Sequence, residues 1–289
     1  MTHPNFIKSN HIYIFASELS VLVGLNKYKN PSEVLLKLWR TNFKTEYQKI
    51  EKKMKDGSLQ QALEENGQQK LERISKKYVD KTQKIKAELE KCQKSQNITE
   101  MKQSQQKMID HCQDLEEKDK LEIQKAIYEV TNTHFGTVQE NKSLHIYTQL
   151  TNQPVIKLSS FHKRPLVQSG DNIWFLGGKL DGILEDKTII EVKNRMNGLF
   201  KSVREYEKIQ THAYMYIFHS NLSQIVETYM KGKNPECGIL EVEFDKKFWK
   251  GIISRVLKFI HYFNKFLKNE KLQIKLLQQG SQQFQMGIF

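Results

Sequence analysis

The region from about residue 44 to residue 130 constrains the fold most, because it is rich in Lys, Gln and Glu and poor in apolar side chains. It contains no proline, and its only glycines are Gly57 and Gly67. Its sparse apolar residues are separated by three, four or seven positions, which predicts long amphipathic helices with a hairpin break near residues 95–97. The apolar stripe is thin, so we expect these helices to lean on the main body or on another chain. We interpret residues 44–130 as a solvated helical insertion without chemistry.

The regions on either side of the insertion have the mixed periodicity of a compact α/β protein. Residues 1–43 are predicted to contribute two short helices, the first ending at Gly24 and the second starting at Asn30-Pro31-Ser32. The main core is expected at residues 131–270, followed by a C-terminal tail at 271–289. We expect strands at 155–161, 166–168, 173–184, 187–194, 224–230 and 239–244, and helices at 203–219 and 246–268. This order predicts an α/β (α+β) fold with a central mixed β-sheet flanked by helices.

The charge balance indicates a polyanionic partner. Lys and Arg outnumber Asp and Glu by 46 to 33, which gives a net charge of +13. Each basic side chain that meets a nucleic-acid phosphate releases a counterion, so this excess favours nucleic-acid binding. Charge alone does not separate DNA from RNA or from an acidic membrane surface.

The cysteines and the N-terminal segment indicate the compartment. Cys92, Cys112 and Cys237 are odd in number and form no C-x-x-C pair, so a reducing compartment fits better than a disulfide framework. We see no signal peptide and no segment as long as a membrane span. We therefore expect a soluble, intracellular protein. The histidines show no zinc-ligand spacing, and no P-loop or Rossmann motif occurs.

The segment Gly177–Arg195 carries the strongest chemical signal. Two β-type runs meet at a predicted turn, Glu185-Asp186-Lys187, and Asp181 lies on the first run. On the second run Glu191 and Lys193 are two residues apart, so their side chains point to the same face, while Ile190 and Val192 point to the core. A hairpin of this length brings Asp181 near the Glu191–Lys193 pair.

Two neighbouring carboxylates repel each other unless a cation lies between them. Mg²⁺ suits such a site, because it binds a few carboxylate oxygens and keeps several waters, and Mn²⁺ is an expected substitute. Such a metal polarises a phosphodiester and activates a bound water, while Lys193 orients that water or stabilises charge on the phosphate. An E-x-K pair by itself is equally typical of any half-exposed strand. Asp181 between Leu180 and Gly182 is the less ordinary feature, since Asp is disfavoured in strands.

Four segments in order resemble the PD-(D/E)XK nuclease superfamily, and more narrowly the phage-lambda-type exonucleases, or YqaJ-type viral recombinases, including members from large DNA viruses. The segments are ASELSVLVGLNKYKNPSEVL, FGTVQENKSLHIYTQLTNQPV, the hairpin with its D…E-x-K, and YEKIQTHAYMYIF. Together they cover about two thirds of the chain, and the resemblance implies a restriction-endonuclease-like core.

The resemblance also implies roles for single residues. Asp181, Glu191 and the Val192 carbonyl would bind the metal, and Lys193 would be the catalytic lysine. Glu140, four residues after Gly136, would reach the metal or its water from a helix, and Gln210 would fix Lys193 or a DNA phosphate. Three alternatives stay open. Glu140 could simply be solvated, and Gly67–Glu72 could supply the helical glutamate instead, although we prefer Glu140. Gln210 and Tyr214 could have a packing role only.

Two departures from the family pattern bear on the assembly. Leu180 stands where many members have proline, and the insertion lies where the family is normally short. Members of the family form ring-shaped trimers that thread DNA, so a homotrimer is an implied assembly that so long an insertion could block or modify. The insertion could instead recruit a partner protein.

Basic residues close to these motifs are predicted to contact DNA phosphates. They are Lys27, Lys29, Lys163, Arg164, Arg195, Lys201 and Arg204. We expect Tyr28 and Trp174 to pack in the core or at its rim, with stacking on bases or wedging between them as the alternative role for each.

The resulting hypothesis is a Mg²⁺-dependent nuclease that trims double-stranded DNA from 5′ ends, in viral-type recombination or genome processing. The alternatives are a structure-specific or restriction-like endonuclease of the same fold, and a DNA-binding or scaffolding module without catalysis.

Overall fold

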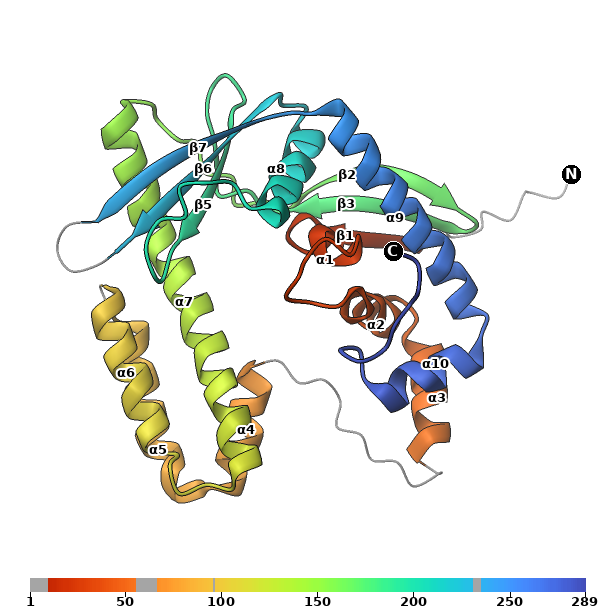
Figure 1. Cartoon of the computed structure of the whole chain (residues 1–289), viewed down its shortest axis with the longest axis horizontal. Helices are drawn as coiled ribbons and strands as arrows, with labels where there is room; N and C mark the ends of the chain where they lie inside the picture. The colour runs from red at the N-terminus through yellow and green to blue at the C-terminus, as the bar shows by residue number, and fades with distance from the viewer. Residues whose placement is uncertain (1–9, 56–66, 96, 231–234) are drawn as a thin grey trace, which may run out of the picture.

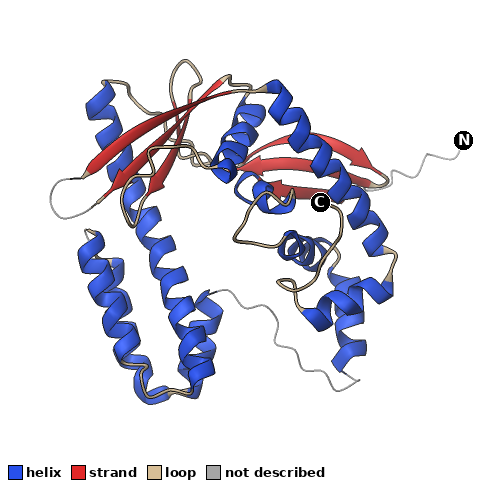
Figure 2. Cartoon of the chain, viewed as in Figure 1, coloured by secondary structure: helices blue, strands red, loops and turns tan. Residues whose placement is uncertain are grey.

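A computed structural model describes residues 10–55, 67–95, 97–230 and 235–289 of the chain. It is an α/β structure with two separate mixed sheets (Figures 1 and 2), which confirms the predicted class. The strands are β1 (Asn10–Phe15), β2 (His162–Ser169), β3 (Asn172–Gly178), β4 (Gly182–Ile183), β5 (Ile189–Asn194), β6 (Leu222–Tyr229) and β7 (Glu236–Glu243).

The first sheet has the order β1-β3-β2, with β1 parallel and β2 antiparallel to β3. The second has the order β4-β5-β6-β7, with β5 and β6 parallel and the outer pairs antiparallel. The expected single strand at 173–184 is therefore wrong, because the chain leaves the first sheet after Gly178 and enters the second at Gly182. The strand expected at 155–161 is reduced to one bridge, Ile156 to Ile183.

The helices are α1 (Leu19–Leu22), α2 (Pro31–Asn42), α3 (Lys44–Lys55), α4 (Gly67–Lys77), α5 (Val79–Gln93), α6 (Ile98–Asp110), α7 (Glu117–Thr151), α8 (Glu205–Phe218), α9 (Lys246–Leu267) and α10 (Glu270–Gln279). A 3-10 turn, η1 (Ala16–Glu18), precedes α1. Asn30 caps α2: its side chain accepts from the Ser32 amide, and Glu33 accepts from the Asn30 amide in return.

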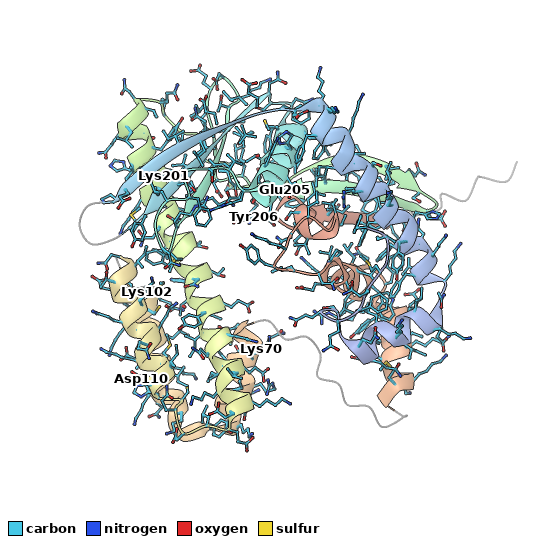
Figure 3. The ribbon with its side chains drawn as sticks, viewed as in Figure 1. Lys70, Lys102, Asp110, Lys201, Glu205 and Tyr206 are labelled. Atoms are coloured by element: carbon cyan, nitrogen blue, oxygen red, sulfur yellow. The ribbon has the colours of Figure 1, made fainter. Side chains whose placement is uncertain are left out.

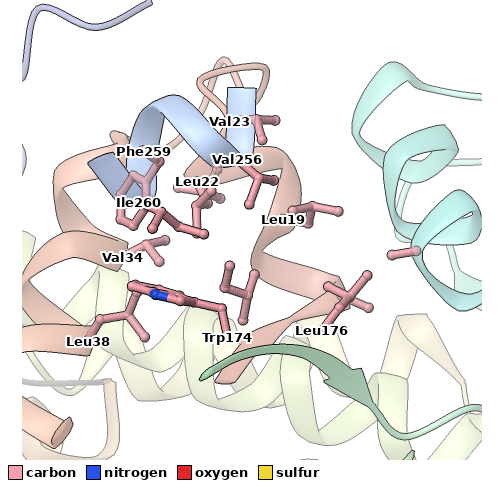
Figure 4. Close-up of a cluster of buried hydrophobic side chains, with 14 of the residues drawn as sticks. Leu19, Leu22, Val23, Val34, Leu38, Trp174, Leu176, Val256, Phe259 and Ile260 are labelled. Carbon is pink, nitrogen blue, oxygen red and sulfur yellow. The ribbon is translucent and has the colours of Figure 1, made fainter. Parts of the chain in front are cut away.

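The main core lies between the first sheet and the helices α1, α2 and α9. Figure 4 shows apolar side chains of α9, such as Phe259 and Ile260, packed towards Leu22 and Trp174. The same cluster continues through α8 to Ile189 and Ile225 of the second sheet. The two sheets are thus joined by one apolar core, with α8 between them.

The second sheet is covered by a different helix on each face. Ile190 and Val192 pack with Leu144 and Tyr147 of α7, as predicted for the inward-facing side of β5. The opposite face of β5, which carries Glu191 and Lys193, faces α8. This layering places the polar pair between a strand and a helix.

Helices α4, α5 and α6 gather round the N-terminal half of α7 and form an arm that projects from the body (Figure 1). α5 ends at Gln93 and α6 begins at Ile98, which confirms the predicted hairpin break. The arm has its own apolar cluster, which includes Met101 and Phe135. It meets the body where the Ile98 amide donates to the Met230 carbonyl, at 3.0 Å.

The segment boundaries expected from the sequence do not coincide with the packing. α3 belongs to the body, because Tyr47 and Ile50 are buried in the main core. α7 runs without a break across residue 130. The C-terminal residues also pack on the body, where Phe284 is buried and its carbonyl accepts from the Ser32 hydroxyl at 2.7 Å.

Within the described residues, no helix combines the length and the apolar character that crossing a membrane requires. All three cysteines carry free thiols.

Candidate active site

Asp181 lies at the point where the chain passes from the first sheet to the second. Gly182 pairs with Ile190 in the antiparallel β4–β5 ladder, so Asp181, one residue earlier, lies opposite Glu191. Opposed residues of antiparallel strands project to the same face, which brings the two carboxylates together. The Val192 amide donates to Asp181 Oδ2 at 2.8 Å and fixes this carboxylate against the edge of β5.

Gly182 is required by close packing at this crossing. A Cβ atom at position 182 would lie 2.2 Å from Cγ1 of Val155, which leaves no room for a side chain. The glycine therefore lets β4 approach its neighbours closely enough to place Asp181 against β5.

Glu191, Lys193 and Gln210 form a closed hydrogen-bonded triangle. Lys193 Nζ donates to Glu191 Oε1 at 2.7 Å and to Gln210 Oε1 at 3.0 Å. Gln210 Nε2 donates to Glu191 Oε1 at 2.7 Å. The side-chain amide of Gln210 thus holds both charged groups of β5. A catalytic role for these residues stays a prediction.

The charged forms of Asp181 and Glu191 are unfavourable side by side in a buried site. Burial, together with the charge of Glu191, raises the pKa of Asp181 to about 8. Burial lowers the pKa of Lys193, but the adjacent Glu191 carboxylate outweighs it, so the Lys193 pKa lies above its ordinary value and the amine stays protonated. Glu191 is 4% exposed, and its Oε2 has no hydrogen-bond partner.

Replacing Asp181 with asparagine should stabilise the metal-free protein in a pH-dependent way. The folded pKa of about 8 exceeds the unfolded value of about 4, so the folded state holds the extra proton between these values. Wild-type stability therefore falls as pH rises through this window. In thermal unfolding with EDTA, we expect the stability of Asp181→Asn relative to wild type to be larger at pH 8 than at pH 5 by about 3 kcal/mol, since one pKa unit corresponds to about 1.4 kcal/mol. A difference that stays constant across this range would contradict the assigned pKa.

One face of α8 lines β5, the strand that carries Glu191 and Lys193. Tyr206, Gln210 and Tyr214 are spaced four residues apart and therefore share this face. The Tyr214 hydroxyl donates to the Lys179 carbonyl at 2.7 Å, and its ring lies where a Cβ of Gly178 would be, 2.9 Å from Cε1. Tyr214 thus secures the segment that leads into Asp181.

Glu140 lies outside the triangle. Its carboxylate pairs with Lys157, Oε1 to Nζ 3.0 Å, although its charge contributes to the raised pKa of Asp181. α7 is docked on β5 close by, where Asn194 Nδ2 donates to the Gly136 carbonyl at 2.8 Å. A role for Glu140 at the metal or its water stays a prediction.

The donor set at the crossing fits a hard, water-rich cation. Nowhere in the described ranges do three His, Cys, Asp or Glu side chains group in a way suited to a metal. Asp181 and Glu191 instead provide two carboxylates, one with an unpartnered oxygen. Because N–H and C=O of a strand residue point to the same edge, the Val192 carbonyl lies on the side where its amide meets Asp181. Mg²⁺, which keeps several waters, suits so few protein ligands.

The expected DNA contacts divide into two groups. Lys27, Lys29, Lys201 and Arg204 are exposed, and no described carboxylate forms an ion pair with any of them. Lys163 is also exposed and donates to the Tyr13 hydroxyl at 2.9 Å.

The structure corrects the predictions for Arg195 and Arg164, whereas Trp174 has the packing role that was expected for it. Arg195 is 7% exposed and its guanidinium pairs with Glu207 and Glu227, so it is not presented to a phosphate. Arg164 is half-buried, donates to the Tyr216 carbonyl at 2.7 Å and stacks on the Tyr216 ring. Trp174 is fully buried in the main core.

Sequence reasoning missed two features beside the triangle. One is the buried Arg195–Glu207–Glu227 cluster, whose signal was a glutamate in the apolar run QIVETYM of β6. The other is Tyr206, which stands one helical turn before Gln210.

No family model matches this chain, and no curated protein matches it. Among solved structures, it is similar to the alkaline exonuclease LHK-Exo from Laribacter hongkongensis, at 16% identity over 51% of this chain and 75% of that chain, with a TM-score of 0.39. The structure of LHK-Exo in complex with dAMP is 13% identical to this chain, over 63% of this chain and 87% of that chain, with a TM-score of 0.38. The structure of SSO0001 is 15% identical to this chain, over 47% of this chain and 62% of that chain, with a TM-score of 0.34. These values are too low to assign a family or an activity.

Proposed function

We propose that this chain is a Mg²⁺-dependent deoxyribonuclease that hydrolyses phosphodiester bonds, in its most specific form a 5′-to-3′ exonuclease on double-stranded DNA. The observation that carries the proposal is the opposition of Asp181 and Glu191 beside Lys193, with one Glu191 oxygen unpartnered. Lys193 offsets only one of the two carboxylate charges, and a metal ion would offset the other, so the arrangement is best accounted for by metal-assisted hydrolysis.

Asp181, Glu191 and the Val192 carbonyl are the residues that would hold the metal. When bound there, Mg²⁺ polarises the phosphodiester and makes a bound water more acidic. Asp181 carries a proton below pH 8 in the metal-free protein and must release it before both carboxylates act as ligands. Metal binding and activity should therefore increase towards alkaline pH.

Lys193 acts on the phosphate or on the attacking water. A lysine ammonium has three N–H donors, and two of them are taken by Glu191 and Gln210. The third remains for a phosphate oxygen or for the water. Gln210 keeps the ammonium in position, because its amide accepts from Lys193 and donates to Glu191 at the same time.

The exposed basic side chains near the site suit a DNA backbone. Lys27 and Lys29 lie between α1 and α2, and Lys201 and Arg204 lie between β5 and α8. With the net charge of +13, these groups support binding to phosphates without reading a base sequence.

The function is tested by incubating end-labelled linear duplex and covalently closed circular DNA with the protein in Mg²⁺, in Mn²⁺ and in EDTA. We expect mononucleotide release from the linear duplex with either metal, none with EDTA, and an intact circle. Labels at the 5′ and 3′ ends report polarity. Cutting of the closed circle would indicate an endonuclease instead, and metal-independent cleavage, or none under any condition, would contradict the proposal.

A further inference from the structure

Tyr28 is an aromatic side chain that the fold leaves uncovered next to the candidate active site. Its exposed fraction of 72% is the largest among the exposed large hydrophobic side chains of the described residues. It lies in the loop between α1 and α2, with Lys27 and Lys29 on either side. An aromatic ring between two exposed lysines is typical of surfaces that bind single-stranded nucleic acid.

The loop holds Tyr28 in a defined position. Asn26 Oδ1 accepts from the Tyr28 amide at 3.0 Å, and Asn26 Nδ2 donates to the Ser20 hydroxyl at 3.3 Å. Two residues after Tyr28, Asn30 caps α2 and donates to the carbonyls of Gln282 and Phe284. The exposed ring is therefore presented by a loop that is fixed on both sides.

Tyr206 connects this ring to the catalytic triangle. The Tyr28 and Tyr206 rings meet edge to face, with centroids 6.3 Å apart and planes at 78°. Tyr206 stands at the N-terminal end of α8 (Figure 3), one helical turn before Gln210 and on the same face. One turn of helix rises about 5.4 Å, so Tyr206 is close to the group that holds Lys193, and the Tyr28 ring follows 6.3 Å from the Tyr206 ring.

Building on the proposed nuclease function, we propose that Tyr28, supported by Tyr206, stacks on the base of a nucleotide adjacent to the scissile phosphate. A base is available to a tyrosine ring only when it is unpaired or unstacked from its neighbour, so the site takes a frayed or single-stranded nucleotide at the reacting end. Every base can stack on an aromatic ring, so this contact selects substrates by the structure of their end and not by their sequence. Lys27 and Lys29 then bind the flanking phosphates.

The test compares Tyr28→Ala, Tyr28→Phe and the control Tyr128→Ala. Tyr128 is 39% exposed and lies on α7 within the arm. Each protein is assayed for kcat/KM on duplexes with an abasic site at the first, second or third nucleotide from the reacting end, and on the intact duplex. On intact DNA we expect Tyr28→Ala to lose on the order of tenfold, and Tyr28→Phe and Tyr128→Ala to match wild type.

The abasic series gives the decisive comparison. At one position, removal of the base should slow wild type to the rate of Tyr28→Ala and should not slow Tyr28→Ala further. If base removal slows both proteins equally at every position, or if Tyr28→Ala matches wild type on intact DNA, the stacking proposal is wrong.

A binding measurement keeps the stacking proposal separate from catalysis. In EDTA, duplexes with 2-aminopurine at the same positions should be quenched further on binding wild type and Tyr28→Phe, but not on binding Tyr28→Ala. If wild type cleaves no DNA yet shows this quenching, the nuclease function fails and the stacking contact stands. If cleavage is metal-dependent but no position is quenched, the contact fails and the nuclease function stands.

Discussion

Replacing Lys193 with alanine should lower the rate of metal-dependent cleavage by about 10²- to 10³-fold, because the proposed mechanism uses its free N–H donor on the phosphate or the attacking water. Lys193 is the positive group in contact with Glu191, and Gln210 holds it in place. The rate is measured in single-turnover cleavage of end-labelled duplex with both protein and Mg²⁺ at saturating concentration, so weaker DNA binding does not contribute.

The controls separate catalysis from folding. Lys193→Ala leaves the buried Glu191 without its ion-pair partner, and loss of stability alone could lower activity. Lys193→Gln keeps a donor for Glu191 without the charge, and it should stay folded with a similarly low rate. Lys258→Ala, at an exposed position on α9, should match wild type. Wild-type rates in folded Lys193→Ala and Lys193→Gln would remove Lys193 from the mechanism.

Replacing Arg195 with alanine should destabilise the protein by about 3–5 kcal/mol, because two buried carboxylates would lose their shared cation. Arg195 Nε donates to Glu227 Oε1 at 2.7 Å, and its Nη1 donates to Glu207 Oε1 at 2.6 Å. Glu207 and Glu227 are 1% and 0% exposed, so water does not replace the lost partner. The free energy of unfolding is measured by urea denaturation at neutral pH.

A rescue variant identifies the cause of this loss. Arg40→Ala, at an exposed position of α2, should change stability by no more than about 0.5 kcal/mol. Adding Glu207→Gln and Glu227→Gln to Arg195→Met should recover much of the loss, since no buried charge then remains unpaired. A loss below about 1 kcal/mol in Arg195→Ala would show that the cluster is hydrated and not buried.

The candidate triad was predictable because it depends on local pattern. Glu191 and Lys193 share a face by strand periodicity, and the turn before β5 sets which residue of the preceding run lies opposite them. Gln210 comes from a helix that follows β5 in the chain, and no local pattern shows that its amide meets these charges. Its place was predicted only through the family resemblance.

The incorrect predictions concern residues whose structure depends on contacts with segments distant in the sequence. The run at 173–184 reads as one strand because both halves have β-type composition, and composition does not show that they pair in different sheets. Arg195 was expected at DNA because it follows Lys193 in a basic chain. Its actual partner Glu227 lies 32 residues away on β6, and that contact forms only when β5 and β6 pair.

The crossing at Lys179–Asp181 makes the catalytic geometry a property of the entire body. The Asp181 carboxylate is held by the Val192 amide, and the segment before it is held by Tyr214 of α8, which donates to the Lys179 carbonyl. Glu191 lies on β5 and accepts from Gln210, also of α8. A peptide of Gly177–Arg195 contains all three charged residues, yet it lacks both anchors and would not reproduce their spacing. Helix α8 therefore supports both acids, and loosening its docking should disturb Asp181 and Glu191 together.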